Sequence, residues 1–335
     1  MHSSRARWHI TFILTMAAFT LAASTQTKSL RLVSTSWPPF TNVEGQPRFA
    51  LELVEAGLGR IGLTATTTIV EASQYTPAVL SGPYDGSAAA WRDADRESAL
   101  IFSQPYLENR LILVARRGTT VAGANLAALK GRRVAIVEGY AYGAEVDNAG
   151  PTYVRSRNED DSLRMLLDSG VDYALMDGLV VQYLVSAYPQ ESRTRLEIGA
   201  APLVTRPLHL AIRRSLPDAQ SIIDRFNAQL RAMISDHTYH KLLHVQWIRA
   251  DIDGDGIPEY VAESDKVGKT QPRNAYSLFS PEALSAQVAK DQERYFFGGS
   301  VYNGWSSVPD RYKVDDLGRT DAMHPTARIF TFSWK

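Results

Sequence analysis

The residues best suited to chemistry in this sequence are the alternating acids of the stretch DIDGDG at positions 251–256. Carboxylates at every second position can point inward at one ion, and a glycine at the sixth position permits the sharp turn of a calcium loop. The sequence therefore predicts a structural calcium ion here. The predicted ligands are Asp251, Asp253, Asp255, the carbonyl of Ile257, and Glu259, with Glu263 as an alternative to Glu259.

This loop matches only the first half of an EF-hand. The twelfth position, where an EF-hand has a glutamate, is Ala262, and Pro258 prevents an ordinary exit helix. The alternative is a solvated acidic turn without an ion. Because closely spaced acids repel one another without a cation, we favour calcium.

The overall composition is that of a globular protein and excludes several classes. The chain has 335 residues, and 36 lysines and arginines balance 36 aspartates and glutamates, so no net field attracts nucleic acid or an anionic membrane. The sequence contains no cysteine, which excludes disulfides, thiolate metal sites, a cysteine nucleophile and a lipidated N-terminal cysteine. It also contains no glycine-rich phosphate loop, HExxH or GxSxG motif.

The N-terminal residues have the layout of a secretory signal peptide. Arg5 and Arg7 precede an uncharged run from Ile10 to Ala23, and small residues follow. The alternative is a membrane anchor, but the run is shorter than the roughly 20 residues that span a bilayer. We expect residues 1–24 to be removed and the mature protein, which is not a lipoprotein, to be periplasmic.

Strands and helices alternate along the next two hundred residues, which predicts an α/β protein with parallel sheets covered by helices on both faces. The expected strands are Leu30–Thr35, Thr64–Val70, Leu111–Ala115, Arg133–Val137, Tyr173–Met176 and Leu208–Ile212. The expected helices are Phe49–Ile61, Tyr75–Leu80, Asp161–Leu167, Leu179–Ala187 and Pro217–Met233. After Trp247 periodicity is weak, so we interpret residues 249–335 as an extension.

Five motifs between Leu30 and Trp247 resemble, in order, those of the family 3 extracellular solute-binding proteins, the polar amino-acid receptors of ABC importers. Any one motif would be weak, but their shared order makes chance similarity implausible. The motifs are WPPF at 37–40; YDG at 84–86 with DR at 95–96 and FSQPY at 102–106; GRRVA at 131–135 with a glycine at 139; LDSGVDYALMD at 167–177; and SDHTYHKLLHVQW at 235–247.

The resemblance implies a type II periplasmic-binding-protein fold, in which two lobes close around a ligand by a hinge. Residues 28–115 and 210–248 would form lobe one, and residues 118–205 would form lobe two. Two crossover strands are expected near Val114–Arg117 and Leu208–Arg213. The extension with its EF-hand-like calcium loop would follow lobe one.

The resemblance also implies a ligand site. Arg96 aligns with the family arginine that grips a ligand carboxylate, which a guanidinium binds bidentately. Asp177 aligns with the acid that receives the ligand's ammonium group, although it is also suited to cap the following helix. Trp37 and Tyr75 align with aromatic residues that sandwich the ligand side chain. Arg96 could instead pair with a neighbouring aspartate.

Several positions depart from the family pattern. The hydroxyl donors that usually precede the acid–arginine pair are replaced by Ala88–Ala90, and Ser34 stands where the family has an acid. Arg92 is expected to substitute as a donor, while Trp91 and the aromatic pair of Tyr140–Tyr142 would make the cleft bulkier. The ligand is therefore not necessarily a standard α-amino acid.

The cluster of His237, His240 and His244 lies on one expected helix face and could hold a metal. The family's terminal helix has the same shape without histidines, so we do not expect a metal there. We expect a monomeric binding protein for an ABC permease, and not an enzyme. A sensory receptor for a membrane kinase is the alternative. A cyclohexadienyl dehydratase on the same scaffold is disfavoured, since such an enzyme would carry an Asn-Pro-Gly-Gly-Thr-Asn stretch near Gly139.

Overall fold

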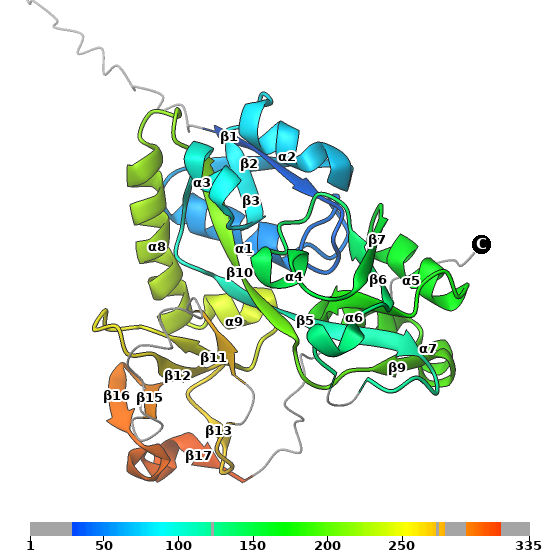
Figure 1. Cartoon of the computed structure of the whole chain (residues 1–335). Helices are drawn as coiled ribbons and strands as arrows, with labels where there is room; N and C mark the ends of the chain where they lie inside the picture. Colours follow the sequence, from blue (N-terminus) through cyan, green and yellow to red (C-terminus); the bar gives the residue numbers. More distant parts are fainter. Residues whose placement is uncertain (1–28, 122–123, 273–274, 279–292, 316–335) are drawn as a thin grey trace, which may run out of the picture.

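The structure, a computed structural model, describes residues 29–121, 124–272, 275–278 and 293–315 (Figure 1). The expected signal peptide, residues 1–24, lies outside the described residues. Among the described helices, none combines the length and apolarity that a membrane span requires. One main sheet runs through two lobes, and a smaller sheet forms the extension below them in Figure 1.

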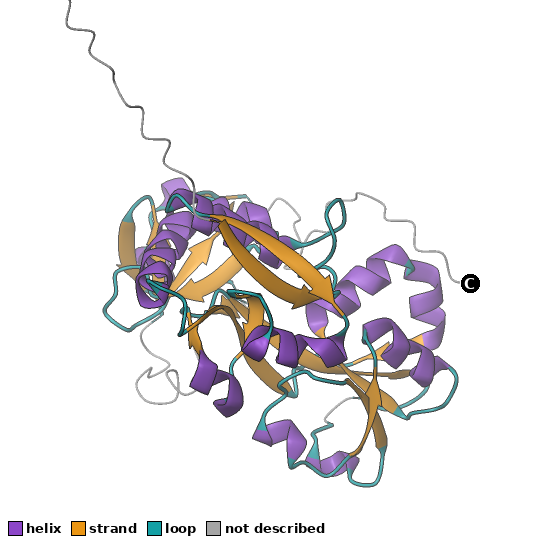
Figure 2. Ribbon diagram, turned by 90° about the horizontal axis from the view of Figure 1, so that it is seen from above, coloured by secondary structure: helices purple, strands orange, loops and turns teal. Residues whose placement is uncertain are grey.

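Lobe one is built on parallel strands covered by helices on both faces (Figure 2). The alternation in the first strand buries Leu30 and Leu32, and the helical spacing of Leu51, Val54 and Leu58 buries one face of the first helix. The elements of lobe one are β1 (Ser29–Thr35), β2 (Thr64–Val70), β3 (Gly86–Trp91), β4 (Leu100–Phe102), α1 (Phe49–Arg60), α2 (Ala72–Ser81), α3 (Ala94–Ala99), α8 (Ala219–Ser235) and α9 (Thr238–Leu243).

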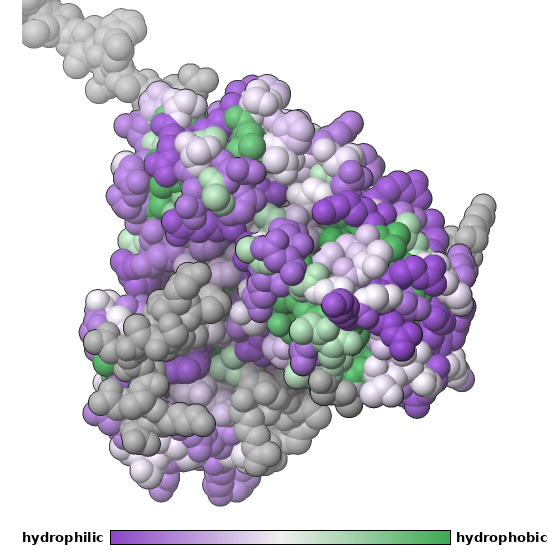
Figure 3. All heavy atoms as spheres, viewed as in Figure 1, coloured by the Kyte–Doolittle hydropathy of each residue, from purple (hydrophilic) through white to green (hydrophobic). Residues whose placement is uncertain are grey.

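Lobe two contains the other end of the main sheet, in which the parallel strands β6, β7 and β8 are joined through helices. Its strands β6 and β8 are buried along almost their whole length, as expected for strands covered on both faces. Its elements are β6 (Arg133–Val137), β7 (Thr152–Ser156), β8 (Tyr173–Asp177), β9 (Leu196–Ile198), η1 (Ala127–Leu129), α4 (Ala144–Asp147), α5 (Glu159–Leu167), α6 (Gly178–Ala187) and α7 (Pro189–Arg195). Figure 3 shows hydrophobic side chains gathered over this lobe on a face that is otherwise mostly hydrophilic.

Two long strands, β5 (Leu107–Arg116) and β10 (Val204–Arg213), cross between the lobes. They pair with each other from Leu107 to Leu111. Further along, β5 pairs with β8 and β9 of lobe two, and β10 pairs with β3 and β4 of lobe one. The strand pairing thus places the first crossing earlier than Val114–Arg117, where the sequence predicts it, because Val114 already lies in the ladder of lobe two.

The described part of the extension folds as a five-stranded sheet in the order β14-β11-β12-β15-β16, and β13 and β17 pair in a separate two-stranded sheet. Aromatic side chains, including a stacked pair of Tyr260 and Tyr295, fill its small core. The weak periodicity of this region did not predict the sheet. Its elements are β11 (Trp247–Ala250), β12 (Glu259–Ala262), β13 (Val267–Gly268), β14 (Tyr276–Ser277), β15 (Arg294–Phe297), β16 (Ser300–Asn303), β17 (Lys313–Val314), η2 (Trp305–Ser307) and η3 (Asp310–Tyr312).

Candidate functional site

The lobes close on a small cavity of about 30 Å³. A cavity of this size holds about one water molecule, whereas pockets for small molecules measure roughly 300–1,000 Å³. A larger ligand therefore requires the lobes to part or the aromatic side chains to swing. The lining residues are Ser34, Thr35, Trp37, Tyr75, Ala89, Trp91, Arg96, Tyr140, Ala141 and Leu208.

Aromatic rings from both lobes fill most of this cleft. The Trp91 ring lies 5.6 Å from Tyr140 and 5.5 Å from Tyr142, and the Trp37 ring lies 5.7 Å from Tyr140, all edge to face. These centroid distances lie in the favourable range for aromatic pairs. The expectation that Trp91, Tyr140 and Tyr142 crowd the cleft is confirmed, and these rings hold the lobes together when closed.

Arg96 is buried, with only 3% of its surface exposed, and it spans the cleft. Its guanidinium donates to the Trp91 carbonyl at 3.0 Å, to Thr76 Oγ1 at 3.1 Å and to the Gly139 carbonyl of lobe two at 3.1 Å. Its Nε also lies 3.4 Å from an Asp93 carboxylate oxygen, which is the neighbouring-acid pairing that the sequence left open. A ligand carboxylate would have to replace the contacts with Thr76 and Gly139 as the lobes part.

The close approach of the two lobes requires a glycine at position 139. Its φ is +79°, and a Cβ on this residue would meet the Ala72 carbonyl oxygen of lobe one at 2.6 Å. A side chain there would hold the lobes apart, so this glycine permits closure at the point where Arg96 reaches across.

Asp177 is buried at the end of β8, where it caps α6. It accepts hydrogen bonds from Leu179 N at 2.7 Å, Val180 N at 3.4 Å, Arg110 N at 3.0 Å and Asn109 Nδ2 at 3.1 Å. Burial raises the pKa of Asp177 to about 7, and these donors limit the rise. Asp177 therefore has the capping role that the sequence offered as an alternative, and it does not line the small cavity.

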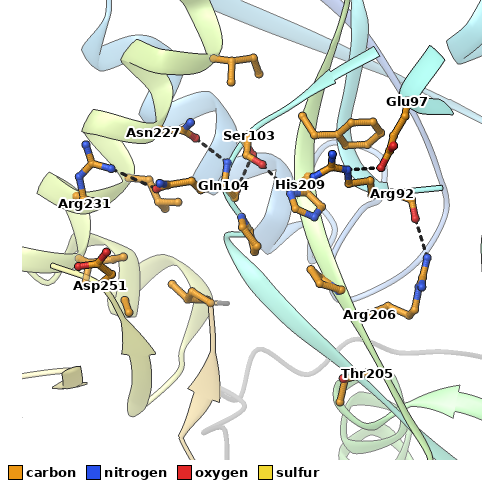
Figure 4. A pocket seen from close by; sticks show the side chains of 18 of the residues that line it. Arg92, Glu97, Ser103, Gln104, Thr205, Arg206, His209, Asn227, Arg231 and Asp251 are labelled. Carbon is orange, nitrogen blue, oxygen red and sulfur yellow. Dashed lines mark hydrogen bonds and ion pairs between the residues drawn. The ribbon is translucent and has the colours of Figure 1, made fainter. Parts of the chain in front are cut away.

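The other predicted ligand residues fall in two places. Trp37 and Tyr75 line the small cavity with Arg96, and the Tyr75 hydroxyl donates to Ser87 Oγ at 2.8 Å. Arg92 does not join them: it pairs with Glu97 and lines a separate, wider cavity of about 780 Å³ (Figure 4). The structure therefore separates Arg92 from the residues that it was expected to assist.

Sequence reasoning missed Glu159, the first residue of α5. Only 7% of its surface is exposed, and its Oε2 atom has no hydrogen-bond partner. Burial, and then the charge of Asp177, raises the pKa of Glu159 to about 8. In sequence Glu159 is one of three acids in the first turn of a helix, a pattern that ordinarily indicates a solvated helix end.

The acidic loop connects β11 to β12 and not two helices, so it is not an EF-hand in structure. Carboxylate oxygens of Asp251, Asp253 and Glu259 lie within 4.8 Å of one another. Glu259 is fully buried at the start of β12 and belongs to this cluster, whereas the alternative, Glu263, does not. Burial raises the pKa of Glu259 to about 7.

A cation from the chain itself reaches this cluster. The Arg294 guanidinium on β15 lies 2.5 Å from Asp253, 2.5 Å from Asp255 and 2.8 Å from Glu259. One guanidinium against the four acids of the loop leaves three negative charges uncompensated when all are ionised. Asp251 is the acid that Arg294 does not contact in these ion pairs. The loop therefore contains an internal counter-charge that neutralises only part of its acidic charge.

Two of the three histidines that the sequence singled out, His237 and His240, attach the extension to lobe one. A ring nitrogen of His237 lies 3.1 Å from the Ala262 carbonyl, and one of His240 lies 3.3 Å from the Val261 carbonyl, both on β12. The His244 ring packs against Phe49 at 4.8 Å. Burial lowers the pKa of His240 to about 3, so its ring stays neutral. These contacts give the cluster a docking role in the structure.

Two α/β lobes, two crossing strands and an interlobe site define the class of two-lobed binding proteins. Residues 31–250 match the family described as bacterial extracellular solute-binding proteins, family 3, and the chain belongs to this family. A curated relative, ABC transporter arginine-binding protein 1 of Escherichia coli K12, is 24% identical over 239 residues, which cover 69% of this chain and 95% of the relative.

Solved structures have the same fold. An ancestral arginine-binding protein bound to arginine aligns with a TM-score of 0.54 at 23% identity, covering 64% of this chain and 96% of that one. The GluR0 ligand-binding core in complex with L-glutamate aligns with a TM-score of 0.55 at 16% identity, covering 65% and 99%. The family supports a solute-binding role, and these alignments support the two-lobed fold.

Proposed function

We propose that the protein binds an amino acid or a related zwitterion in its interlobe cleft and delivers it to an ABC-type importer. The observation that carries the proposal is the buried guanidinium of Arg96, which lies between the lobes and donates to an acceptor on each. A ligand carboxylate can take over these donors in a bidentate arrangement. The similarity to an arginine-binding transporter component supports the same assignment.

The test is calorimetry of three variants against a panel of amino acids, amines and small carboxylates. Arg96→Ala should weaken binding by about 2–5 kcal/mol, the cost of truncating one partner of a buried, hydrogen-bonded charge pair. Arg96→Lys should not restore it, because lysine lacks the planar fork. Arg92→Ala is the matched control and should bind normally. If all three variants bound the ligand with the affinity of the wild type, Arg96 would not be part of the binding site.

Transport is distinguished from sensing by the membrane partner. We propose an ABC permease, with a membrane sensor kinase as the alternative and a periplasmic location in either case. Deleting the gene should abolish uptake of the radiolabelled ligand if the protein serves import. Unchanged uptake with a lost transcriptional response would support the sensor. An N-terminus that starts between about Ser24 and Thr27 in periplasmic protein would support export by a cleaved signal peptide.

We also propose that the acidic loop binds calcium in a structural role. The support is the convergence of Asp251, Asp253 and Glu259 and the excess negative charge that Arg294 leaves. Asp255 and the Ile257 carbonyl remain the other proposed ligands. Oxygen ligands of this kind suit Ca²⁺, and millimolar extracellular calcium fills even weak sites.

A further inference from the structure

The strongest unexplained group in the described part of the cleft is the carboxyl of Glu159. None of the ion pairs among the described residues includes it, although it is more than nine-tenths buried. Burying an unpaired carboxyl is costly, so such a group ordinarily marks a binding function and not a contribution to stability. Asp177 adds to the cost, since its charge acts on Glu159.

Glu159 does not line the small cavity itself, but it lies close to two residues that do, Trp37 and Tyr140. Its carboxyl lies near enough to the Trp37 indole of lobe one to be affected by that N–H, although the Trp37 nitrogen has no partner in a standard hydrogen bond. Its charge also acts on the hydroxyls of Tyr140 and Tyr142. An acid among aromatic side chains is a typical environment for an organic cation, which the ring faces also attract.

We propose that Glu159 is the receptor for a positively charged group of the ligand, an ammonium or guanidinium held against the rings of Trp37, Tyr140 and Tyr142. This inference rests on the proposed binding function and narrows the ligand class to cationic amino acids and amines. Arg96 would hold the carboxylate of such a ligand and Glu159 its cationic side chain. Asp177, whose oxygens already accept four hydrogen bonds, would contribute charge but no new contact.

Binding of a cation should displace a proton. The groups that act on Glu159 are Asp177, Asp160 and Trp37, and Glu159 acts on Tyr140 and Tyr142; none of these carries a positive charge, and Arg155 acts on Tyr142. With a pKa of about 8, Glu159 is mostly protonated at pH 7 in the ligand-free protein. A cationic ligand stabilises the ionised form, so up to one proton leaves on binding, and affinity rises with pH until the carboxyl is already ionised.

The experiment compares L-arginine with its neutral isostere L-citrulline by calorimetry in buffers of different ionisation enthalpy. The wild type should prefer arginine and release a proton. Glu159→Gln should lose roughly 30-fold or more of its arginine affinity, bind citrulline as before and release no proton. Glu138→Gln, which neutralises an exposed glutamate of the same lobe, is the matched control and should behave as the wild type.

The ligand-free variant supplies an independent check. Because Glu159 makes no ion pair among the described residues and its Oε2 atom has no hydrogen-bond partner, Glu159→Gln should melt no lower than the wild type, whereas a structural role predicts a lower melting temperature. Equal affinity of the wild type for arginine and citrulline would overturn this inference and leave the proposed function standing. If neither ligand binds, nor any other amino acid or amine of the panel, both fail.

Discussion

The balance between Arg294 and calcium in the acidic loop can be tested with one substitution, Arg294→Gln. The guanidinium is the internal counter-charge of Glu259, which is fully buried, and of Asp253 and Asp255, whose side chains are 42% and 44% exposed. Breaking a buried ion pair by removing one partner costs about 3–5 kcal/mol. Because two of the three contacts are partly solvated, we expect Arg294→Gln to lose free energy of unfolding near the lower limit, about 3 kcal/mol, in the presence of a chelator.

Calcium should reverse this loss. Removing Arg294 leaves all four acids of the loop available to one divalent cation. An ion that binds only the folded state adds RT ln(1 + [Ca]/Kd), about 2.7 kcal/mol at a hundredfold excess over Kd. Arg294→Gln should therefore depend on calcium more strongly than the wild type does.

The assay is thermal melting combined with limited proteolysis of the extension, in EDTA and in calcium. Arg249→Gln is the matched control, since Arg249 lies on β11, the strand that leads into the loop, with its guanidinium 5.0 Å from the Tyr260 ring. It should show no added calcium dependence. If Arg294→Gln in EDTA melts as the wild type does, the guanidinium does not stabilise the loop. If calcium protects neither protein, the loop is not a calcium site.

Two further predictions concern how the extension is attached. Arg110→Ala should lower the free energy of unfolding by about 1–2 kcal/mol and increase hydrogen exchange in β14, because it removes a cation–π contact with Tyr276 and a hydrogen bond to the Ala275 carbonyl. The control Arg31→Ala breaks the ion pair of Arg31 with Asp85 at the surface and should lower it by less than about 1 kcal/mol. His240→Asn should make the stability of the protein less sensitive to acid. The pKa of His240 is about 3 in the folded protein and 6.5 in the unfolded chain, so the unfolded chain binds the proton first as the pH falls. Acidification from pH 7 to 5 therefore lowers the free energy of unfolding by about 2 kcal/mol through this group. Equal acid sensitivity of variant and wild type in urea titrations would contradict the second prediction.

The lobes were predictable because their strands and helices have clear apolar periods. The strand Thr64–Val70 and the strand Arg133–Val137 have the predicted bounds, and the helix predicted at Phe49–Ile61 ends one residue earlier. Strand β3 was not predicted, since its alanines have little intrinsic preference for strands. It is a strand because it pairs with β10, where a Cβ on Gly86 would meet the Ala211 carbonyl oxygen at 2.0 Å.

Part of the candidate site could be predicted from the sequence, and part could not. Trp37, Tyr75 and Arg96 could be selected because ordered motifs carry them, and the structure places all three around one cavity. Glu159 could not be selected, since its surroundings include Trp37 of the other lobe, more than a hundred residues away in sequence. Arg294 was missed for the same reason: nothing in the acidic loop indicates which distant strand supplies a counter-charge.

The contacts of the extension show that it is not a distant appendage to the binding lobes. Next to the point where β5 crosses between them, Arg110 binds β14, and Glu108 accepts from Ser277 N at 3.0 Å. Between these two residues, Asn109 accepts from the Trp91 indole at 2.8 Å and donates to Asp177. Three consecutive residues of one crossing strand thus contact the extension on one side and the cleft on the other. Because hinge closure changes the backbone where the strands cross, a cation that ordered the extension would act on the same segment as a ligand that closed the lobes.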